Sequence, residues 1–462
     1  MFSETRLRNM DASFIHPWHP FDYLRDNGPS FVSTAKGCYL YDAEGKRYFD
    51  AVGGLWCTNI GAGREDMAKA ISDQILKLSY ANPFGNLSHE PAVELSDKLV
   101  SLAPAHLNHV YYGGGGSDVL DSAVRMIHYY QNIRGKHQKK NIIARKLSYH
   151  GTTYVTQSLG GIPTNRDVQW DFITDWVHHV RPAYTYRDCP EGATEEEYTE
   201  ILVKDFEDKI AELGGPDHVA AFFAEPIMGG GGVLPPPANY LKRMSETCAA
   251  NDILFVADEV VTGFGRLGHW IASDGEFGIK ADIVATAKGL TSGYQPLGAG
   301  FVSDKVWEVL AEPGSGRVMS NGYTYSAHTV ACAAALKNIE IMETENVFDN
   351  VNTVGKYFQE KIETLKEFEI VGDARGLKFM MGIEYVADKK TKRHFAPEVG
   401  IAARVAKEAY ARGVIARPAY HLNILSPALV ATEEDVDLCV AALREGIKAT
   451  TIALRKESLL GA

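Results

Sequence analysis

The chain has 462 residues, 45% of them hydrophobic and 23% charged, which is enough for a large buried core in two domains or in one domain with an appended lobe. The formal net charge of −12 argues against nucleic-acid or anionic-membrane partners, because these require a basic face. The six cysteines lack CxxC or metal-ligand spacing, and no apolar run reaches about eighteen residues, so no disulfide framework, metal site or membrane span is indicated. We therefore expect a cytoplasmic enzyme.

The first sixty residues predict an arm, a hairpin and a loop. Residues 1–30 combine prolines with aromatic side chains, which is typical of an extended arm that packs on another surface, often that of a partner subunit. Residues 38–50 are rich in aromatics around Gly45 and predict a β-hairpin. An irregular loop, Gly53–Cys57, follows and contains Trp56. We interpret Trp56 as a core residue unless this loop faces a functional site.

Two amphipathic helices are expected next, over residues 64–79 and 90–102. Their apolar side chains recur at helical spacing, so one face of each helix should pack on the core. These side chains are Met67, Ala70, Ile71, Ile75 and Leu78 in the first helix, and Val93, Leu95 and Leu99 in the second.

A strand that begins at Val110 runs into four glycines, Gly113–Gly116, and a helix opens at Ser117. The backbone amides of a first helical turn have no partners within the helix, and the helix dipole adds positive potential. This loop therefore predicts a phosphate site, with the Ser117 hydroxyl as a further donor. A dinucleotide-binding fingerprint is the alternative. It would need the loop in the first strand-helix turn and an acid about twenty residues further on, and neither feature is evident.

Strands and helices alternate through the middle of the chain. A strand over residues 141–146 precedes Tyr149-His150, a pair that is either structural or supplies an aromatic ring for stacking on a planar cofactor. A buried strand over residues 219–224 ends in Glu225-Pro226, and further strands begin near residues 253, 283 and 297. This alternation predicts an α/β doubly wound sheet.

An acid and an amine stand at the ends of two of these strands. Residues 253–258 are an apolar run that closes on Asp258, and residues 283–287 are a second run that closes on Lys288. Ligands of an open parallel sheet bind at the carboxyl edge of the strands, so both side chains are candidates for one site. Taken alone, Lys288 could simply extend its ammonium to water. Together with Asp258 it matches the pyridoxal-phosphate arrangement, in which a lysine amine binds the cofactor aldehyde and an aspartate pairs with the ring nitrogen.

With these motifs the chain resembles the class III aminotransferases of the pyridoxal-phosphate fold-type I superfamily, and most of all the amine:pyruvate transaminases, or ω-transaminases. The most specific stretches are Glu225–Gly229, Asp258–Arg266 and Ala287–Leu290. The resemblance implies a large, mostly parallel cofactor domain over residues 60–328. It also implies a smaller α+β domain made of the N-terminal arm, residues 1–59, and residues 329–462.

The resemblance also implies roles for individual residues. Lys288 would form the Schiff base, Asp258 would pair with the pyridinium, and Val260 and Tyr149 would lie against opposite faces of the ring. The remaining cofactor residues would be Gly116, Ser117, Glu225 and, across a homodimer interface, Thr324. The substrate residues would be Trp56, Tyr149 and Arg417.

Arg417 follows an apolar strand over residues 414–416 and precedes Pro418, so its backbone is fixed while its side chain is long. We expect the guanidinium to hold an oxo-acid carboxylate in one half-reaction and to swing out to solvent when a carboxylate-free amine binds. The alternative is an exposed arginine at the end of a strand.

Some positions depart from the family pattern. Gly115 replaces the first serine of the usual phosphate motif, which predicts weaker phosphate binding. Gly85 stands where amine:pyruvate members have phenylalanine, and Gly230 stands where alanine is common, which together predict a roomier pocket. Tyr323 replaces an interface phenylalanine.

The function expected from this resemblance is transfer of an amino group from a primary amine or ω-amino acid to an oxo acid such as pyruvate, by a ping-pong mechanism on pyridoxal 5′-phosphate. The enzyme would be a homodimer, or a tetramer of two such dimers. The alternatives are an aminomutase or a decarboxylating transaminase on the same cofactor, and a binding or regulatory protein without turnover. Retention of both Lys288 and Asp258 speaks against the last of these.

Overall fold

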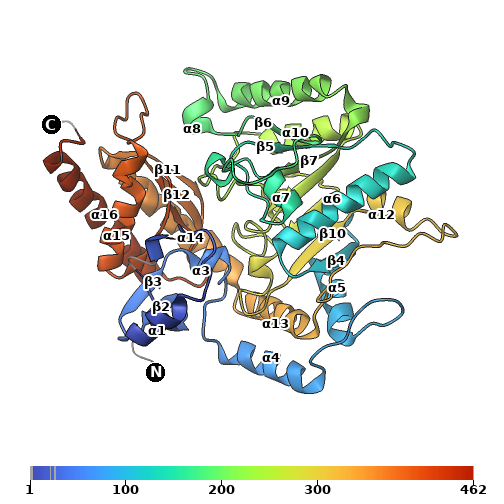
Figure 1. Cartoon of the computed structure of the whole chain (residues 1–462), viewed down its shortest axis with the longest axis horizontal. Coiled ribbons are helices and arrows are strands. Elements are labelled where there is room, and N and C mark those ends of the chain that lie inside the picture. The colour runs from blue at the N-terminus through green and yellow to red at the C-terminus, as the bar shows by residue number, and fades with distance from the viewer. Residues whose placement is uncertain (1–3, 21, 25–27, 461–462) are drawn as a thin grey trace.

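The computed structural model describes residues 4–20, 22–24 and 28–460. Its centre is a seven-stranded sheet in the order β4-β10-β9-β8-β7-β5-β6 (Figure 1). The strands are β4 (His109–Gly113), β5 (Asn141–Arg145), β6 (Val177–Val180), β7 (Val219–Ala224), β8 (Leu254–Asp258), β9 (Ile283–Thr286) and β10 (Gly298–Val302). Strands β9, β8, β7, β5 and β6 are parallel, and β10 is antiparallel to both of its neighbours. The predicted α/β, mostly parallel sheet is confirmed.

Helices cover both faces of this sheet, which explains why its central strands are apolar throughout. Successive side chains of a strand point to opposite faces. Phe223 therefore packs in a core with helix α6 (Gly116–Ile133), whereas Phe222 packs in the opposite core with helices α5 (Glu90–Leu102), α9 (Glu195–Glu212) and α10 (Tyr240–Ala250). All residues of β7 and β8 are buried.

The two ends of the chain meet in a second lobe, where the blue N-terminal and red C-terminal elements of Figure 1 lie together. One sheet has the order β1-β2-β3-β13 and the other β11-β12-β15-β14. Strand β13 pairs in parallel with β3, so residues near 415 extend a sheet that begins near residue 32. The bounds are β1 (Val32–Lys36), β2 (Tyr39–Asp42), β3 (Arg47–Asp50), β11 (Val371–Leu377), β12 (Met380–Tyr385), β13 (Val414–Ile415), β14 (Arg417–Ala419) and β15 (Leu422–Leu425).

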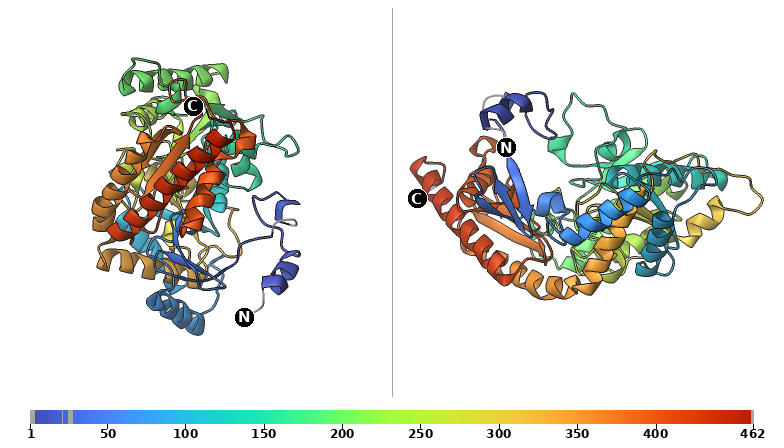
Figure 2. Two further views of the ribbon diagram at one scale, coloured as in Figure 1. Left: turned by 90° about the vertical axis from the view of Figure 1, so that its left-hand side faces the viewer. Right: turned by 90° about the horizontal axis from the view of Figure 1, so that it is seen from below.

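Helix α13 (Thr329–Thr344) belongs to both cores, because Ile339 packs with the large sheet and Ile341 with the terminal lobe. Figure 2 shows the helices of the C-terminal half wrapped along the outside of that lobe. The domain boundaries expected at residues 60 and 328 stay a prediction. The other helices of the terminal lobe are α14 (Val347–Glu363), α15 (Ile401–Ala411) and α16 (Glu433–Lys456).

The remaining elements are short or peripheral. They are α1 (Glu4–Asp11), α3 (Gly53–Trp56), α4 (Glu65–Lys77), α7 (Tyr154–Leu159), α8 (Thr185–Asp188), α11 (Ala272–Gly275), α12 (Asp304–Leu310) and the 3₁₀ turns η1 (Pro163–Asn165), η2 (Pro216–His218), η3 (Lys288–Leu290), η4 (Thr364–Glu367) and η5 (Pro397–Val399). Within the described ranges, no helix combines the length and the apolar character needed to cross a membrane.

Four sequence expectations need correction. The N-terminal arm is not extended throughout, since it contains helix α1. The expected irregular loop at Gly53–Cys57 includes the short helical turn α3, although Gly54 and Leu55 have non-helical dihedrals. In the helix expected over residues 64–79, which ends at Lys77, Ile75 is 49% and Leu78 37% exposed, so the prediction that these two side chains pack on the core is wrong. The helix over residues 90–102 forms, but Val93 is 58% exposed, so the same prediction for Val93 is also wrong. Apolar residues at helical spacing can extend beyond the side of a helix that is buried, so spacing alone does not show which of them are covered.

Candidate active site

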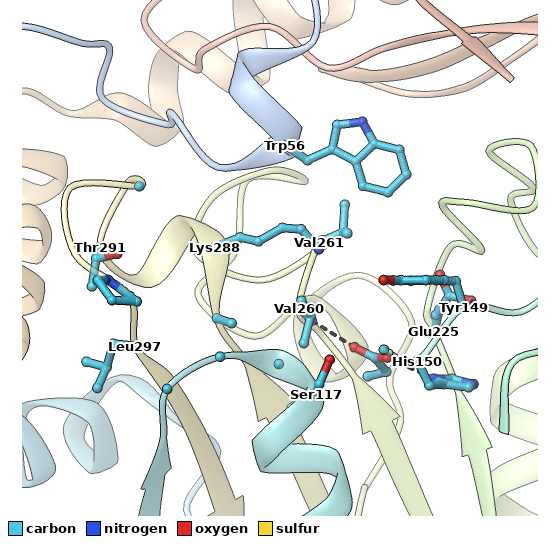
Figure 3. A pocket seen from close by; sticks show the side chains of 18 of the residues that line it. Trp56, Ser117, Tyr149, His150, Glu225, Val260, Val261, Lys288, Thr291 and Leu297 are labelled. Atoms are coloured by element: carbon cyan, nitrogen blue, oxygen red, sulfur yellow. Dashed lines mark hydrogen bonds and ion pairs between the residues drawn. The ribbon is translucent and has the colours of Figure 1, made fainter. Parts of the chain in front are cut away.

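A cavity of about 410 Å³ opens at the carboxyl edge of the large sheet (Figure 3). It is bounded by the ends of β8 and β9, by the glycine loop before α6, and by the α3 turn of the terminal lobe. Its lining residues are Trp56, Gly114–Ser117, Tyr149–Gly151, Glu225, Ile227, Asp258, Val260, Val261, Ala287, Lys288, Thr291, Gly293 and Gln295–Leu297. The cavity therefore lies at the carboxyl edge of the sheet, where the strand-end positions of Asp258 and Lys288 predicted a site.

Asp258 is the last residue of β8 and is 4% exposed. One carboxylate oxygen, Oδ1, accepts a hydrogen bond from the Val260 amide at 3.0 Å. The other, Oδ2, lies 2.8 Å from Nδ1 of His150. An ionised carboxylate can only accept, so the imidazole Nδ1–H donates. Both oxygens are thus fixed, and the carboxylate is held at the floor of the cavity.

Lys288 lies just past the end of β9, at the first position of the η3 turn, with φ of 41°. This left-handed backbone is uncommon outside glycine, and such positions concentrate at functional sites. Its Nζ is 5.9 Å from the centroid of the Trp56 ring. Burial lowers the pKa of the Lys288 ammonium, although the charge of Asp258 opposes the shift. A depressed pKa leaves more of the amine in its neutral, nucleophilic form.

The glycine loop opens helix α6 toward the cavity. Gly115 is the residue before the helix and Gly116 the first within it. A Cβ on Gly116 would lie 2.8 Å from Cγ2 of Val260, so glycine is required for the loop to approach that side chain. The Ser117 hydroxyl accepts a hydrogen bond from the Thr152 amide at 3.1 Å. At Gly115 a Cβ would meet nothing within 4 Å, so the serine expected there in relatives would fit.

Tyr149 and Glu225 are joined through the backbone. Oε1 of Glu225 accepts from the Tyr149 amide at 3.0 Å, and Oε2 accepts from the Gly229 amide at 2.8 Å. Burial raises the pKa of the Glu225 carboxyl, and the neighbouring His150 opposes that shift. Glu225 therefore fixes the loop that carries Tyr149 and the start of the glycine run at 229–232.

Trp56 lies above Lys288 in Figure 3 and closes the cavity from the terminal lobe. It is 4% exposed. A Cβ on Gly229 would be 2.4 Å from its ring, so the indole rests directly on the glycine run. The α3 turn therefore faces the cavity, the condition under which Trp56 was expected to be more than a core residue, and its contact with substrate stays a prediction.

Two of the expected residues are not in the cavity wall. The Arg417 guanidinium lies 5.4 Å from the centroid of the Trp56 ring, and burial lowers its pKa. Among the described residues no carboxylate forms an ion pair with Arg417. Thr324 is exposed and lies away from the cavity, where its carbonyl accepts from the Tyr80 hydroxyl at 2.6 Å.

His150 is the main residue that sequence reasoning undervalued. The pair Tyr149-His150 was interpreted as either structural or stacking, and only the tyrosine was assigned to the site. The imidazole is buried and bonded to Asp258, which is 108 positions away in the chain. Its place directly after a strand of the parallel sheet was the available signal. Val261, Thr291 and Leu297 also line the cavity without having been singled out.

A family model described as aminotransferase class III matches residues 23–447. The chain belongs to the class III aminotransferases. This aminotransferase is 37% identical to the diaminobutyrate–2-oxoglutarate transaminase of Halomonas elongata over 463 residues, with 98% of each chain covered. It is 36% identical to the putrescine–pyruvate aminotransferase of Pseudomonas aeruginosa over 441 residues, with 95% of each covered.

Among solved structures, the thermostable (S)-enantioselective ω-transaminase of Thermomicrobium roseum is similar to this aminotransferase, with a TM-score of 0.94 and 33% identity. The match covers 97% of this chain and 99% of that one. The resemblance to the ω-transaminases is therefore confirmed. The resemblance holds over the whole fold, both lobes included.

Class III aminotransferases use pyridoxal 5′-phosphate, and the residues of this cavity fit that group. The Lys288 amine, whose pKa is lowered, could bind the cofactor aldehyde. The fixed Asp258 carboxylate could pair with the pyridinium nitrogen. The N-terminus of α6 with the Ser117 hydroxyl suits its phosphate.

Proposed function

We propose that this class III aminotransferase binds pyridoxal 5′-phosphate in the 410 Å³ cavity and moves an amino group from a primary amine or ω-amino acid to an oxo acid such as pyruvate. The observation that carries the proposal is the convergence of three groups on one cavity. These are the Lys288 amine, the Asp258 carboxylate and the amide-rich start of α6. The reaction is ping-pong, since donor and acceptor use the same cavity in turn.

When bound, the cofactor supplies an electron sink that lets the donor carbon lose a proton. Nζ of Lys288 would hold the cofactor through its aldehyde and, when free, would act as the base and acid that moves this proton. Asp258 keeps the ring nitrogen protonated, and His150 holds Asp258 in place. The Gly116 amide and the Ser117 hydroxyl bind the phosphate.

The other residues orient the ring and exclude water. Tyr149 and Val260, from separate loops of the cavity wall, would lie against opposite faces of the ring. Glu225 orients Tyr149 through its backbone amide. Trp56 covers the cavity and shields the reacting groups from solvent.

Arg417 selects the acceptor. A guanidinium can pair with an oxo-acid carboxylate through two parallel hydrogen bonds. The absence of a carboxylate ion pair to Arg417 among the described residues leaves that capacity available. Its guanidinium lies 5.4 Å from the centroid of the Trp56 ring, beside the cavity, and from there it would swing out to solvent when a carboxylate-free amine binds.

The proposed working unit is a homodimer in the cytoplasm, in which Thr324 gives its hydroxyl to the phosphate of the neighbouring cofactor. Support for a shared site comes from the exposure of Thr324 and of the adjacent Tyr325, which is 64% exposed. Support for a reducing compartment comes from the six cysteines, all of which are free.

A product assay tests the proposed function. Purified protein is incubated with pyridoxal 5′-phosphate, 1-phenylethylamine and pyruvate, and acetophenone and alanine are measured. Parallel reactions use putrescine as donor and 2-oxoglutarate as acceptor, and Lys288→Ala is the control. Equal amounts of ketone and alanine, absent with the control, support the proposal. An isomerised amine without alanine would indicate an aminomutase, and release of carbon dioxide from an amino-acid donor would indicate a decarboxylating transaminase.

A further inference from the structure

Arg375 in strand β11 joins the terminal lobe to the wall of the active site. Its guanidinium donates to the carbonyl oxygen of Gly232 from Nη2 at 2.8 Å and to that of Val233 from Nε at 3.0 Å. The side chain is 10% exposed. Two carbonyls of one loop are therefore held by a single rigid group, whose donors have a fixed geometry.

A buried carboxylate fixes Arg375 in turn. Glu384, in the neighbouring strand β12, is 1% exposed and accepts from Nη1 of Arg375 at 2.6 Å. It also accepts from Nε of Arg187 at 2.7 Å and from the Tyr184 hydroxyl. Although burial opposes the shift, the hydrogen bond with His394 and the charge of Arg375 hold the pKa of the Glu384 carboxyl well below its usual range. The carboxylate thus stays charged and keeps Arg375 in one orientation.

The loop that Arg375 holds consists of the glycine run 229–232 and Val233. On its other side this run touches two aromatic walls of the active site. A Cβ on Gly229 would lie 2.4 Å from the Trp56 ring, and a Cβ on Gly230 would lie 3.2 Å from Cβ of Tyr149. Because these contacts are so close, Trp56 and Tyr149 must move whenever the loop shifts toward them by a fraction of an ångström.

We propose that Arg375 is a positioning residue that sets the width of the substrate site. Its guanidinium holds residues 229–233 against Trp56 and Tyr149, so the distance between the two walls depends on a side chain that touches neither substrate nor cofactor. The expected effect of Arg375 on substrate binding rests on the proposed function. The expected effect of Arg375 on the loop does not.

Arg187 offers a matched control, because a purely stabilising role would be shared by both arginines. Arg187, in α8, donates to the same Glu384 carboxylate, and its other donors reach His394 and the carbonyl of Lys392. It makes no hydrogen bond to the glycine run. Replacement of either arginine by lysine keeps a positive charge next to Glu384 but removes the planar group.

The experiment compares Arg375→Lys with Arg187→Lys. Hydrogen exchange of the amides of residues 229–234 is measured in each variant, with and without cofactor. Arg375→Lys is expected to accelerate exchange in this peptide by about tenfold, the effect of losing one or two hydrogen bonds, while Arg187→Lys leaves it within about twofold. With 1-phenylethylamine, KM should rise by about fivefold in Arg375→Lys with kcat changed less, and both should be retained in Arg187→Lys.

Equal acceleration in both variants, or none in Arg375→Lys, would overturn the proposal. If Arg375→Lys does not fold, Arg375→Gln is compared with Arg187→Gln and read in the same way, because each of these variants leaves Glu384 paired with one arginine. A protein that shows the exchange difference but no transamination with any donor would contradict the proposed function and leave the role of Arg375 in the loop intact.

Discussion

His150 and Asp258 form a buried pair, in which the imidazole Nδ1 lies 2.8 Å from the carboxylate Oδ2. The His150 side chain is fully buried and that of Asp258 is 4% exposed. The two come from different strands, since His150 follows β5 and Asp258 ends β8. Because the Val260 amide holds the other oxygen, the pair fixes the carboxylate in one orientation at the edge of the cavity.

His150→Leu should lower kcat/KM by about tenfold to a hundredfold, because it removes a hydrogen bond to a charged group worth about 1.5–3 kcal/mol. His150→Asn places an amide N–H near the position of Nδ1 and should recover most of the rate. Steady-state kinetics of the two variants, at matched cofactor occupancy, gives the comparison. Equal activity in His150→Leu and the wild type would show that Asp258 needs no orienting partner.

Arg417→Ala should weaken the pyruvate half-reaction by roughly ten- to a hundredfold in kcat/KM, the equivalent of a lost bidentate pair, and leave the half-reaction of a carboxylate-free amine largely unchanged. Single-turnover absorbance changes of the cofactor measure the two halves separately. Equal losses in both halves, or none in either, would remove Arg417 from the site.

Thr324 can be tested by subunit exchange. If its hydroxyl serves the neighbouring subunit, a hybrid of Lys288→Ala and Thr324→Ala chains contains one site that lacks both residues and one intact site. Random exchange should then restore about a quarter of the wild-type sites, since about half of the dimers are hybrids. Demonstrated exchange without activity above that of the two parents would assign Thr324 to its own subunit or to no site.

Lys288 also makes the stability of the apoenzyme depend on pH. Burial lowers the pKa of the folded lysine below its ordinary value of 10.5. At a pH between the pKa of Lys288 in the folded protein and that in the unfolded chain, the unfolded chain binds more protons than the folded protein. The stability of the folded protein therefore rises with pH across this range. Lys288→Met should therefore unfold at a higher temperature than the wild-type apoenzyme at pH 7, by about 1–2 °C, with a gap that narrows toward pH 10. A constant gap from pH 7 to pH 10 would indicate that the folded lysine titrates normally.

The sequence was sufficient for six of the seven strands of the large sheet and for most of the cavity, because these follow from local patterns, whereas β6 was not among the expected strands. Apolar runs that end in Asp258 and Lys288, and a glycine loop that opens a helix at Gly116, place polar groups at one edge of a parallel sheet. The order of the strands then brings those groups together.

Contacts between distant segments could not be predicted in this way. Arg375 lies 143 positions from the Gly232 carbonyl that it holds, and no local pattern links a strand of the terminal lobe to a loop of the large sheet. The exposure of Val93 was mispredicted for a related reason. Helical spacing shows which residues share a face, but whether another segment covers that face depends on the tertiary arrangement.

The most direct test of the central claim is to find which lysine binds the cofactor. The purified protein is incubated with pyridoxal 5′-phosphate, reduced with borohydride, digested and mapped by mass spectrometry, with Lys288→Ala treated in parallel. The account predicts the reduced cofactor on Lys288, a yellow protein before reduction, and neither label nor transamination in the variant. Label on another lysine, such as Lys280 or Lys305, with Lys288 unmodified, would contradict it.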